Sequence, residues 1–157
     1  MKSKLLLFTV SLCLIVSLNA CKSKKQAQKS KAATNAITEV KANIIFEKGS
    51  SLSSVIKKAK KENKPIFIEF YTDWCFPCKM MEDYVFTDVT VANFFNENYI
   101  SLKVDGEKGE GPSLIKKFKV TGYPTLLYLN AKGEVIEHIT GSITGSQLLS
   151  AAQKGVK

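Results

Sequence analysis

The sequence has no arginine, one histidine, one tryptophan and only four cysteines among its 157 residues. Without arginine, and without a basic stripe interleaved with aromatic side chains, the chain gives little support to nucleic-acid binding. The single histidine, His138, leaves few ligands for zinc, which proteins bind mostly through four Cys or His side chains. No apolar run reaches the about 20 residues that a transmembrane helix requires. With 45% apolar residues the chain can still fold around a core, and its length is that of one domain.

The longest apolar run lies near the start of the chain, where residues 5–18 carry no charge and follow two lysines. A short positive start before such a run is typical of a secretion signal. Residues 18–21, Leu-Asn-Ala-Cys, resemble the lipobox of bacterial lipoproteins, and the resemblance implies cleavage before Cys21 and a lipid on that cysteine. We therefore expect residues 1–20 to be a lipoprotein signal peptide. Ordinary cleavage without lipidation, which would leave a soluble exported protein, is the alternative.

Most of the positive charge lies outside the predicted domain. The 23 lysines and 14 acidic residues give a net charge of +9. Residues 1–20 hold +2, residues 21–42 hold six lysines and one acid, and residues 43–157 hold 15 lysines and 13 acids, a net of only +2. Because residues 21–42 contain few bulky side chains, we expect a lipid-anchored, basic and flexible tether. Its lysines are a solvated spacer in the simplest interpretation, and weak attraction to anionic lipid headgroups is an additional one.

Residues 43–157 alternate between strand and helix patterns. Residues 66–71 are apolar almost throughout, as in a central strand, although one acid, Glu69, lies among them. Thr144 and Gln147 form a capping box, which predicts the start of a final helix. The predicted strands are 44–46, 66–71, 100–104, 125–129 and 135–139, and the predicted helices are 51–59, 75–85, 88–95, 114–118 and 144–152. This order predicts an α/β fold in which helices cover both faces of a mixed sheet.

Two cysteines, Cys75 and Cys78, lie where the predicted central strand gives way to a helix. At this spacing the thiols share one helix face at a separation that a disulfide can span. The helix N-terminus stabilises a thiolate at Cys75, and Pro77 is tolerated in the first turn. A zinc site would need two further ligands, and only His138 and the two N-terminal cysteines are available. A structural disulfide is possible, but so short a loop constrains the unfolded chain little, which favours thiol–disulfide exchange.

Two motifs resemble the thioredoxin superfamily: residues 69–79, EFYTDWCFPCK, and residues 122–125, GYPT. The resemblance extends over residues 44–153. The length and the extra helix near Asp88 are most similar to periplasmic thioredoxin-like proteins related to the C-terminal domain of the transmembrane thiol:disulfide interchange reductase. This resemblance implies the thioredoxin fold and an enzyme that exchanges thiols and disulfides with no cofactor beyond its own cysteine pair.

The resemblance also implies roles for individual residues. Cys75 attacks a substrate disulfide and Cys78 resolves the mixed disulfide. Glu69, six residues before Cys75, matches a buried acid that moves a proton to or from the resolving thiol, and burial on a strand would raise its pKa. A Glu69 that lies at an edge and reaches water is the alternative. The residues expected to contact substrate are Trp74, Phe76, Pro77, Tyr123 and Pro124, with Pro124 in the cis form.

Two departures from the family pattern affect these expectations. Phe76-Pro77 replaces the usual Gly-Pro between the cysteines, and the bulky ring is expected to change substrate fit and redox potential. Thioredoxins also tend to carry a lysine near the buried acid, and alignment of the motifs puts Ser101 at that position. We therefore expect different proton handling.

Taken with the predicted signal, the motifs lead us to expect a monomeric reductant of protein disulfides on the periplasmic side of a bacterial membrane. A membrane electron donor would recycle it. Oxidase or isomerase activity is the alternative direction, because roughly 30 mV already represents about 1.4 kcal/mol for a two-electron couple and sequence does not fix the potential so finely. An alternative of another class is a membrane-tethered binding or chaperone module whose disulfide is structural.

Overall fold

The computed structural model describes residues 42–156, so the predicted signal peptide, Cys21 and residues 21–41 of the tether lie outside the described residues. The elements follow the predicted order, with one short π-helical segment, η1, continuing the helix after the cysteines. They are β1 (Phe46–Glu47), α1 (Leu52–Glu62), β2 (Ile66–Tyr71), α2 (Phe76–Met80), η1 (Met81–Val85), α3 (Val89–Asn98), β3 (Ile100–Asp105), α4 (Gly111–Phe118), β4 (Thr125–Leu129), β5 (Val135–Thr140) and α5 (Gly145–Ala152). None of the helices within residues 42–156 is long and apolar enough to span a bilayer.

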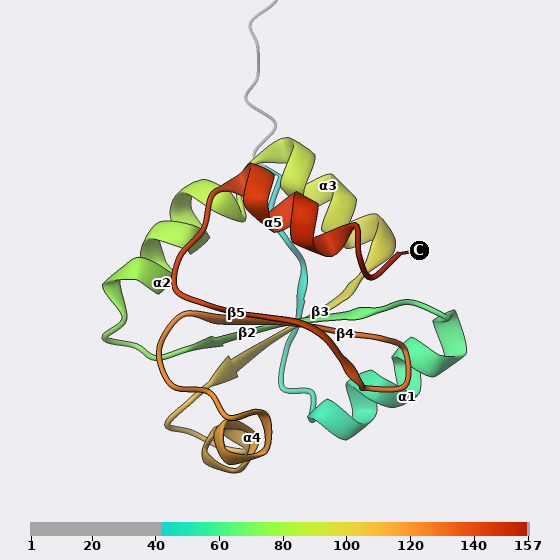
Figure 1. Ribbon diagram of the computed structural model, residues 1–157, viewed down its shortest axis with the longest axis horizontal. Helices are drawn as coiled ribbons and strands as arrows, with labels where there is room; N and C mark the ends of the chain where they lie inside the picture. Colours follow the sequence, from blue (N-terminus) through green and yellow to red (C-terminus); the bar gives the residue numbers. More distant parts are fainter. Residues whose placement is uncertain (1–41, 157) are drawn as a thin grey trace, which may run out of the picture. The chain divides into compact units, whose positions relative to one another are not determined.

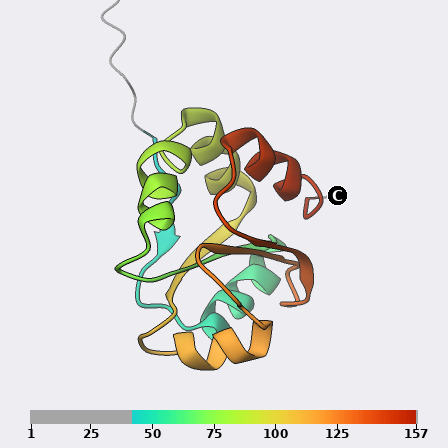
Figure 2. The same ribbon diagram turned by 60° about the vertical axis from the view of Figure 1, so that its left-hand side comes forward.

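The five strands form one mixed sheet in the order β1-β3-β2-β4-β5. Strand β2 is central, parallel to β3 and antiparallel to β4, while β1 and β5 form the two edges. Figure 1 views the sheet nearly edge-on, with α2, α3 and α5 on one side and α1 and α4 on the other. Figure 2 shows the same layers from a view turned by 60°. The predicted α/β thioredoxin fold, with a mixed sheet between two helical layers, is confirmed.

Alternate residues of β2 face the two helical layers, because side chains point to opposite sides along a strand. Phe67 packs in the cluster that includes residues of η1, α3 and α5, with its ring centroid 4.7 Å from that of Phe95 and 5.3 Å from that of Tyr128. Ile68 and its neighbours in register pack in the second cluster, against α1 and α4. Glu69 is two residues after Phe67, so its side chain points to the same face of the sheet. This face is covered by α2 and η1, the layer that carries the cysteines.

Short-range signals set several helix starts. The Ser51 hydroxyl accepts a hydrogen bond from the Ser54 N–H at the start of α1, and the Asp88 carboxylate accepts one from the Val91 N–H at the start of α3. The predicted capping box of α5 is present in both directions. Each of these caps satisfies an N–H group that has no partner within its helix.

Most of the other predicted elements differ from the structure by one to three residues at a bound, and two predicted elements differ in more than that. The first strand is Phe46–Glu47 rather than 44–46, because the buried Ile44 donates its N–H to the Phe86 carbonyl, at 3.1 Å, instead of joining the sheet. Of this apolar run only Ile44 is buried, while Ile45 is exposed and Phe46 begins the strand. The predicted helix 75–85 is a five-residue α-helix followed by η1, in which the Phe86 N–H donates to the Met81 carbonyl at 2.8 Å, five residues back. Such π-helical turns occur frequently at functional sites.

Candidate active site

The two cysteines of the motif form a disulfide at the start of α2, just beyond the end of central strand β2. Their Cα atoms are 5.3 Å apart, and both residues are buried, with Cys75 2% and Cys78 1% exposed. The Cys75 N–H donates to the Thr72 carbonyl at 3.1 Å, and the Cys78 N–H donates to the Cys75 sulfur at 3.2 Å. The Cys75 sulfur therefore caps the helix, so the reduced form would present a thiolate to a backbone N–H and to the positive end of α2.

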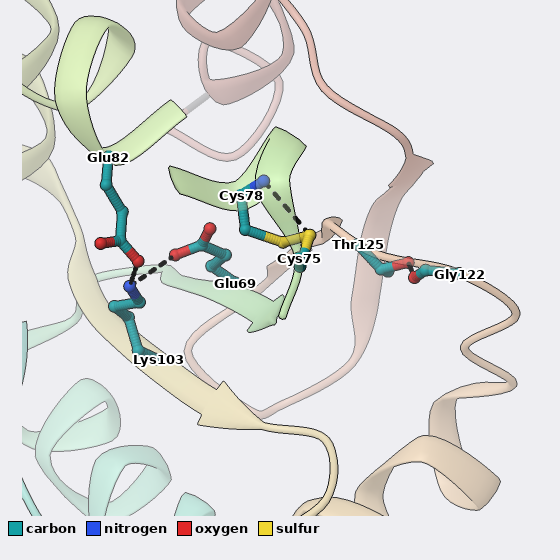
Figure 3. Close-up of a disulfide and its surroundings, with 7 residues drawn as sticks. All are labelled: Glu69, Cys75, Cys78, Glu82, Lys103, Gly122 and Thr125. Carbon is teal, nitrogen blue, oxygen red and sulfur yellow. Dashed lines mark hydrogen bonds and ion pairs between the residues drawn. A yellow bond between two sulfur atoms is a disulfide. The ribbon is translucent and has the colours of Figure 1, made fainter. Parts of the chain in front are cut away.

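Glu69 lies beneath this helix as a fully buried acid. One of its carboxyl oxygens is 3.4 Å from the Lys103 ammonium group, and Lys103 also pairs with Glu82 of η1. Burial raises the pKa of Glu69 to about 7; Lys103 opposes this rise and Glu82 adds to it. In the view of Figure 3 the Glu69 carboxyl group lies between the lysine and the disulfide. A carboxyl group whose pKa is raised to about 7 thus lies on the side of the sheet that carries the cysteines.

The lysine of this cluster corrects the expectation from the sequence. In the parallel pairing of β2 with β3, Glu69 lies opposite Lys103, while Ser101 lies opposite Phe67. A lysine beside Glu69 is therefore present at Lys103, two positions after Ser101 and on the same face of the strand. Burial alone would lower the pKa of Lys103, but the neighbouring carboxylates of Glu69 and Glu82 more than offset it and hold that pKa above its ordinary value.

An apolar groove of about 510 Å³ opens beside Cys75. The peptide bond between Tyr123 and Pro124 is cis, and the Thr125 hydroxyl donates across this turn to the Gly122 carbonyl at 2.7 Å (Figure 3). The groove is lined by Trp74, Cys75, Phe76, Pro77, Thr121, Gly122 and Tyr123. It thus brings together four of the five residues expected to contact substrate, and Pro124 follows Tyr123 without lining the groove.

Three charged residues near the site were missed from the sequence: Lys103, Glu82 and Glu107. Glu82 follows Cys78 by four residues, a spacing that places two helical residues on one face and could have indicated it. Lys103 could be placed only with the register of β3 against β2, which sets it directly opposite Glu69. Glu107 lies in the loop after β3 and hydrogen-bonds Trp74, a contact that no sequence pattern marks. Within residues 42–156 no three His, Cys, Asp or Glu side chains gather into a potential metal site.

Comparisons with known proteins agree with this geometry. A family model described as a thioredoxin-like domain matches residues 52–155. The thiol:disulfide interchange protein DsbD of Yersinia pestis is 34% identical over 98 residues, covering 60% of this chain and 16% of that protein. DsbD of Actinobacillus pleuropneumoniae is 31% identical over 117 residues, covering 71% of this chain and 20% of that protein. The chain therefore spans a fifth or less of the length of these curated relatives.

Solved structures give the same result. A proposed disulphide-isomerase from Bacteroides thetaiotaomicron is 41% identical, with a TM-score of 0.65, over 74% of this chain and 96% of that chain. The oxidised C-terminal domain of DsbD from Neisseria meningitidis is 23% identical, with a TM-score of 0.57, over 71% of this chain and 98% of that one, and supports the fold alone. The family model covers well over half of the chain and includes both motifs. This chain belongs to the thioredoxin-like domain family.

Proposed function

We propose that this protein is a thiol–disulfide oxidoreductase that reduces disulfides in other proteins through Cys75 and Cys78. The observation that carries the proposal is the position of the disulfide, which caps α2 between an open apolar groove and a buried carboxyl group. A purely structural disulfide would need neither neighbour. The kinship with interchange proteins and with a proposed disulphide-isomerase supports the same chemistry.

The reaction starts from the reduced pair. The Cys75 thiolate attacks one sulfur of the substrate disulfide, forming a mixed disulfide and releasing the other substrate sulfur as a thiolate. The Cys78 thiolate then attacks the Cys75 sulfur, which closes the disulfide seen in the structure and releases the second substrate sulfur. Two electrons and two protons pass to the substrate, so a dithiol donor must reduce the pair before the next cycle.

Glu69 is the group that we assign to proton transfer in the second step. Cys78 is 1% exposed, so its thiol has poor access to water as a base. The nearby carboxyl group has its pKa raised to about 7 by burial, which matches the pH at which a general base works best. Lys103 and Glu82 connect Glu69 toward solvent, because their side chains are 23% and 40% exposed.

The substrate segment would lie in the groove beside Cys75. Trp74, Phe76 and Pro77 line it together with Tyr123, and the cis-linked Pro124 follows Tyr123 in the chain. Phe76 is 70% exposed, so its ring is available to a partner rather than used in the core. Contact with these side chains is expected to select protein disulfides over small ones.

Reduction is the direction that we favour, because the motifs resemble periplasmic thioredoxin-like proteins related to a transmembrane thiol:disulfide interchange reductase, and thiol:disulfide interchange proteins are among the relatives. The 41% identical structure described as a proposed disulphide-isomerase favours isomerase activity as the second candidate, with oxidase activity as a further alternative. A membrane-tethered binding or chaperone module with a structural disulfide is the alternative of another class.

We further propose that the protein is exported and held on the periplasmic side of a bacterial membrane by a lipid on Cys21, with residues 21–42 as its tether. A soluble periplasmic form is the alternative. Its partners would then be protein disulfides and a membrane-linked dithiol donor, with no nucleic acid and no second copy of the chain required. Labelling with radioactive palmitate, compared between the wild type and Cys21→Ser, tests the anchor; no label in the wild type would contradict it.

Trapping tests the enzymatic proposal. In Cys78→Ser the mixed disulfide on Cys75 cannot be resolved, so we expect protein adducts in cell extracts that dithiothreitol releases. The matched variant Cys75→Ser lacks the attacking thiol and should form none. If Cys78→Ser yields no adducts and the wild type fails to reduce a protein disulfide in vitro, the pair is structural.

The reduction potential of the Cys75–Cys78 couple decides the direction. A value near that of thioredoxin, about −270 mV, supports a reductant, whereas a value near about −120 mV, as in a strong periplasmic oxidant, reverses it. Equilibration with defined ratios of reduced and oxidised dithiothreitol or glutathione measures the potential.

A further inference from the structure

The only tryptophan of the chain is exposed and yet held in place. Trp74 is 67% exposed, its indole N–H donates to the Glu107 carboxylate at 3.0 Å, and its ring stands edge-on to Tyr123 with centroids 5.9 Å apart. An exposed tryptophan without polar partners would sample several rotamers. These two contacts fix one orientation, in which the ring lines the groove beside Cys75.

Glu107 belongs to the loop of residues 106–110 between β3 and α4. This loop contacts the end of β3 and the segment before the cysteines. The Glu107 N–H donates to the Asp105 carboxylate at 2.9 Å, and this bond lowers the pKa of Asp105. The Lys108 ammonium group pairs with Asp105 at 3.1 Å and also with Asp73, the residue before Trp74. The loop is therefore tied to the end of β3 and to the segment that leads into the cysteines.

The same loop contacts a second aromatic side chain that lines the groove. Tyr123 packs directly on Gly106, where an added Cβ would lie 2.2 Å from the tyrosine oxygen. The Gly106 N–H donates to the Tyr71 carbonyl at 2.8 Å, which fixes this glycine against the end of β2. Two aromatic side chains that line the groove, Trp74 and Tyr123, thus both contact the loop of residues 106–110.

We propose that Glu107 is a positioning residue that holds Trp74 as the groove wall for a bulky apolar side chain next to the substrate disulfide. This inference rests on the proposed function and adds the class of sequence that the site prefers. The groove offers aromatic and proline surfaces and little else, so apolar flanking residues gain most from burial there. Glu107 does not touch the sulfur atoms and acts through Trp74.

Three variants of the full-length protein test the proposal. Glu107→Ala removes the acceptor of the indole N–H, whereas Glu107→Gln keeps an amide oxygen at that position. Glu97→Ala is the control, because Glu97 is an exposed acid on α3, lining a different pocket. The substrates are two peptide disulfides, one with Leu and Phe beside the cysteines and one with Ser and Gly, together with bis(2-hydroxyethyl) disulfide.

Two readouts separate positioning from a structural role. All intrinsic tryptophan emission comes from Trp74, so its anisotropy reports the freedom of this ring alone. We expect lower anisotropy in Glu107→Ala and a KM for the apolar-flanked peptide raised roughly three- to tenfold, the loss expected for one hydrogen bond. The kcat, and the rate with bis(2-hydroxyethyl) disulfide, should remain unchanged because the sulfur atoms and Glu69 are untouched. Glu107→Gln and the control should match the wild type.

Other outcomes overturn the inference. Unchanged anisotropy in Glu107→Ala would show that Glu107 does not hold the ring. Lower anisotropy with an unchanged KM, or an equal KM rise for both peptides, would show that the orientation of Trp74 does not select apolar flanks. A wild type that reduces none of the three disulfides would refute the proposed function itself, whereas an active wild type with an indistinguishable Glu107→Ala variant refutes only this inference.

Discussion

Replacing Glu69 with glutamine removes the one acid that β2 buries completely, while the shape of the side chain is kept. In the wild type, burial raises the pKa of this group from 4.5 to about 7 in the folded protein. The folded state therefore holds the proton more tightly than the unfolded chain does. It follows that the stability of the wild type falls as the pH rises through this interval, and that Glu69→Gln lacks this dependence.

The size of the effect follows from the shift. At about 1.4 kcal/mol per pKa unit, a rise from 4.5 to about 7 corresponds to about 3 kcal/mol, which is lost between these two pH values. The difference in the free energy of unfolding between Glu69→Gln and the wild type should therefore shift by about 3 kcal/mol in favour of the variant from about pH 4 to about pH 8. The buried amide carries its own desolvation cost, but that cost does not change with pH. Lys103 retains Glu82 as its partner in the variant.

Guanidinium unfolding of the oxidised proteins at the two pH values measures this difference, since the disulfide form has no titrating thiols at the site. Glu97→Gln is the matched control for the loss of one carboxylate, because this acid is exposed on α3. A Glu69→Gln effect that is equal at both pH values would show that Glu69 does not titrate in this interval. The role of Glu69 as a proton carrier near neutral pH would then lose its basis.

Three further changes, the last with a control, have defined outcomes. Lys103→Met removes the cation that opposes the rise, so the pKa of Glu69 should move further above 7, measured by NMR titration of its carboxyl carbon; an unchanged midpoint would contradict the pairing. Phe67→Ala should lower the free energy of unfolding by about 3–5 kcal/mol in urea, because this fully buried ring contacts several other aromatic rings. Gly111→Ala should cost about 3 kcal/mol in the same assay, because its Cβ would lie 1.8 Å from a backbone oxygen. Gly49→Ala, with a φ of +64° and open space around it, should cost only about 1 kcal/mol, and equal losses would refute the clash.

Features encoded within a few residues could be predicted from the sequence. The capping box of Thr144 and Gln147 is complete in the structure, and the spacing of Cys75 and Cys78 gave a pair that closes a disulfide. The apolar run around Glu69 correctly indicated a central strand. In each case the determining interactions join neighbours in the chain, or follow from burial on both faces of one strand.

Features that depend on pairing between distant segments could not be predicted in this way. Lys103 was missed because the register of β3 against β2 decides whether it or Ser101 lies opposite Glu69, and both choices keep the same face. The π-helical turn places Met81 and Val85 against residues of α3 and α5, which are distant in the sequence. The Trp74–Glu107 contact spans 33 residues and requires the conformation of a loop.

The position at which the chain enters the domain has a mechanical consequence. Strand β1 is an edge strand that pairs with β3 at only two positions, whereas β2, which leads to the cysteines, has six pairs with β3 and five with β4. A pulling force applied at residue 42 would first load the hydrogen bonds of Ile44 to Phe86 and of Ile45 to Asn96, and then β1, whose two pairs at an edge separate more easily than the central ladder. The junction of β2 with α2 would keep its geometry while β1 separates from β3. Tension at this point would therefore act on the end of η1, through Ile44 and Phe86, before it reached β2 and the cysteines.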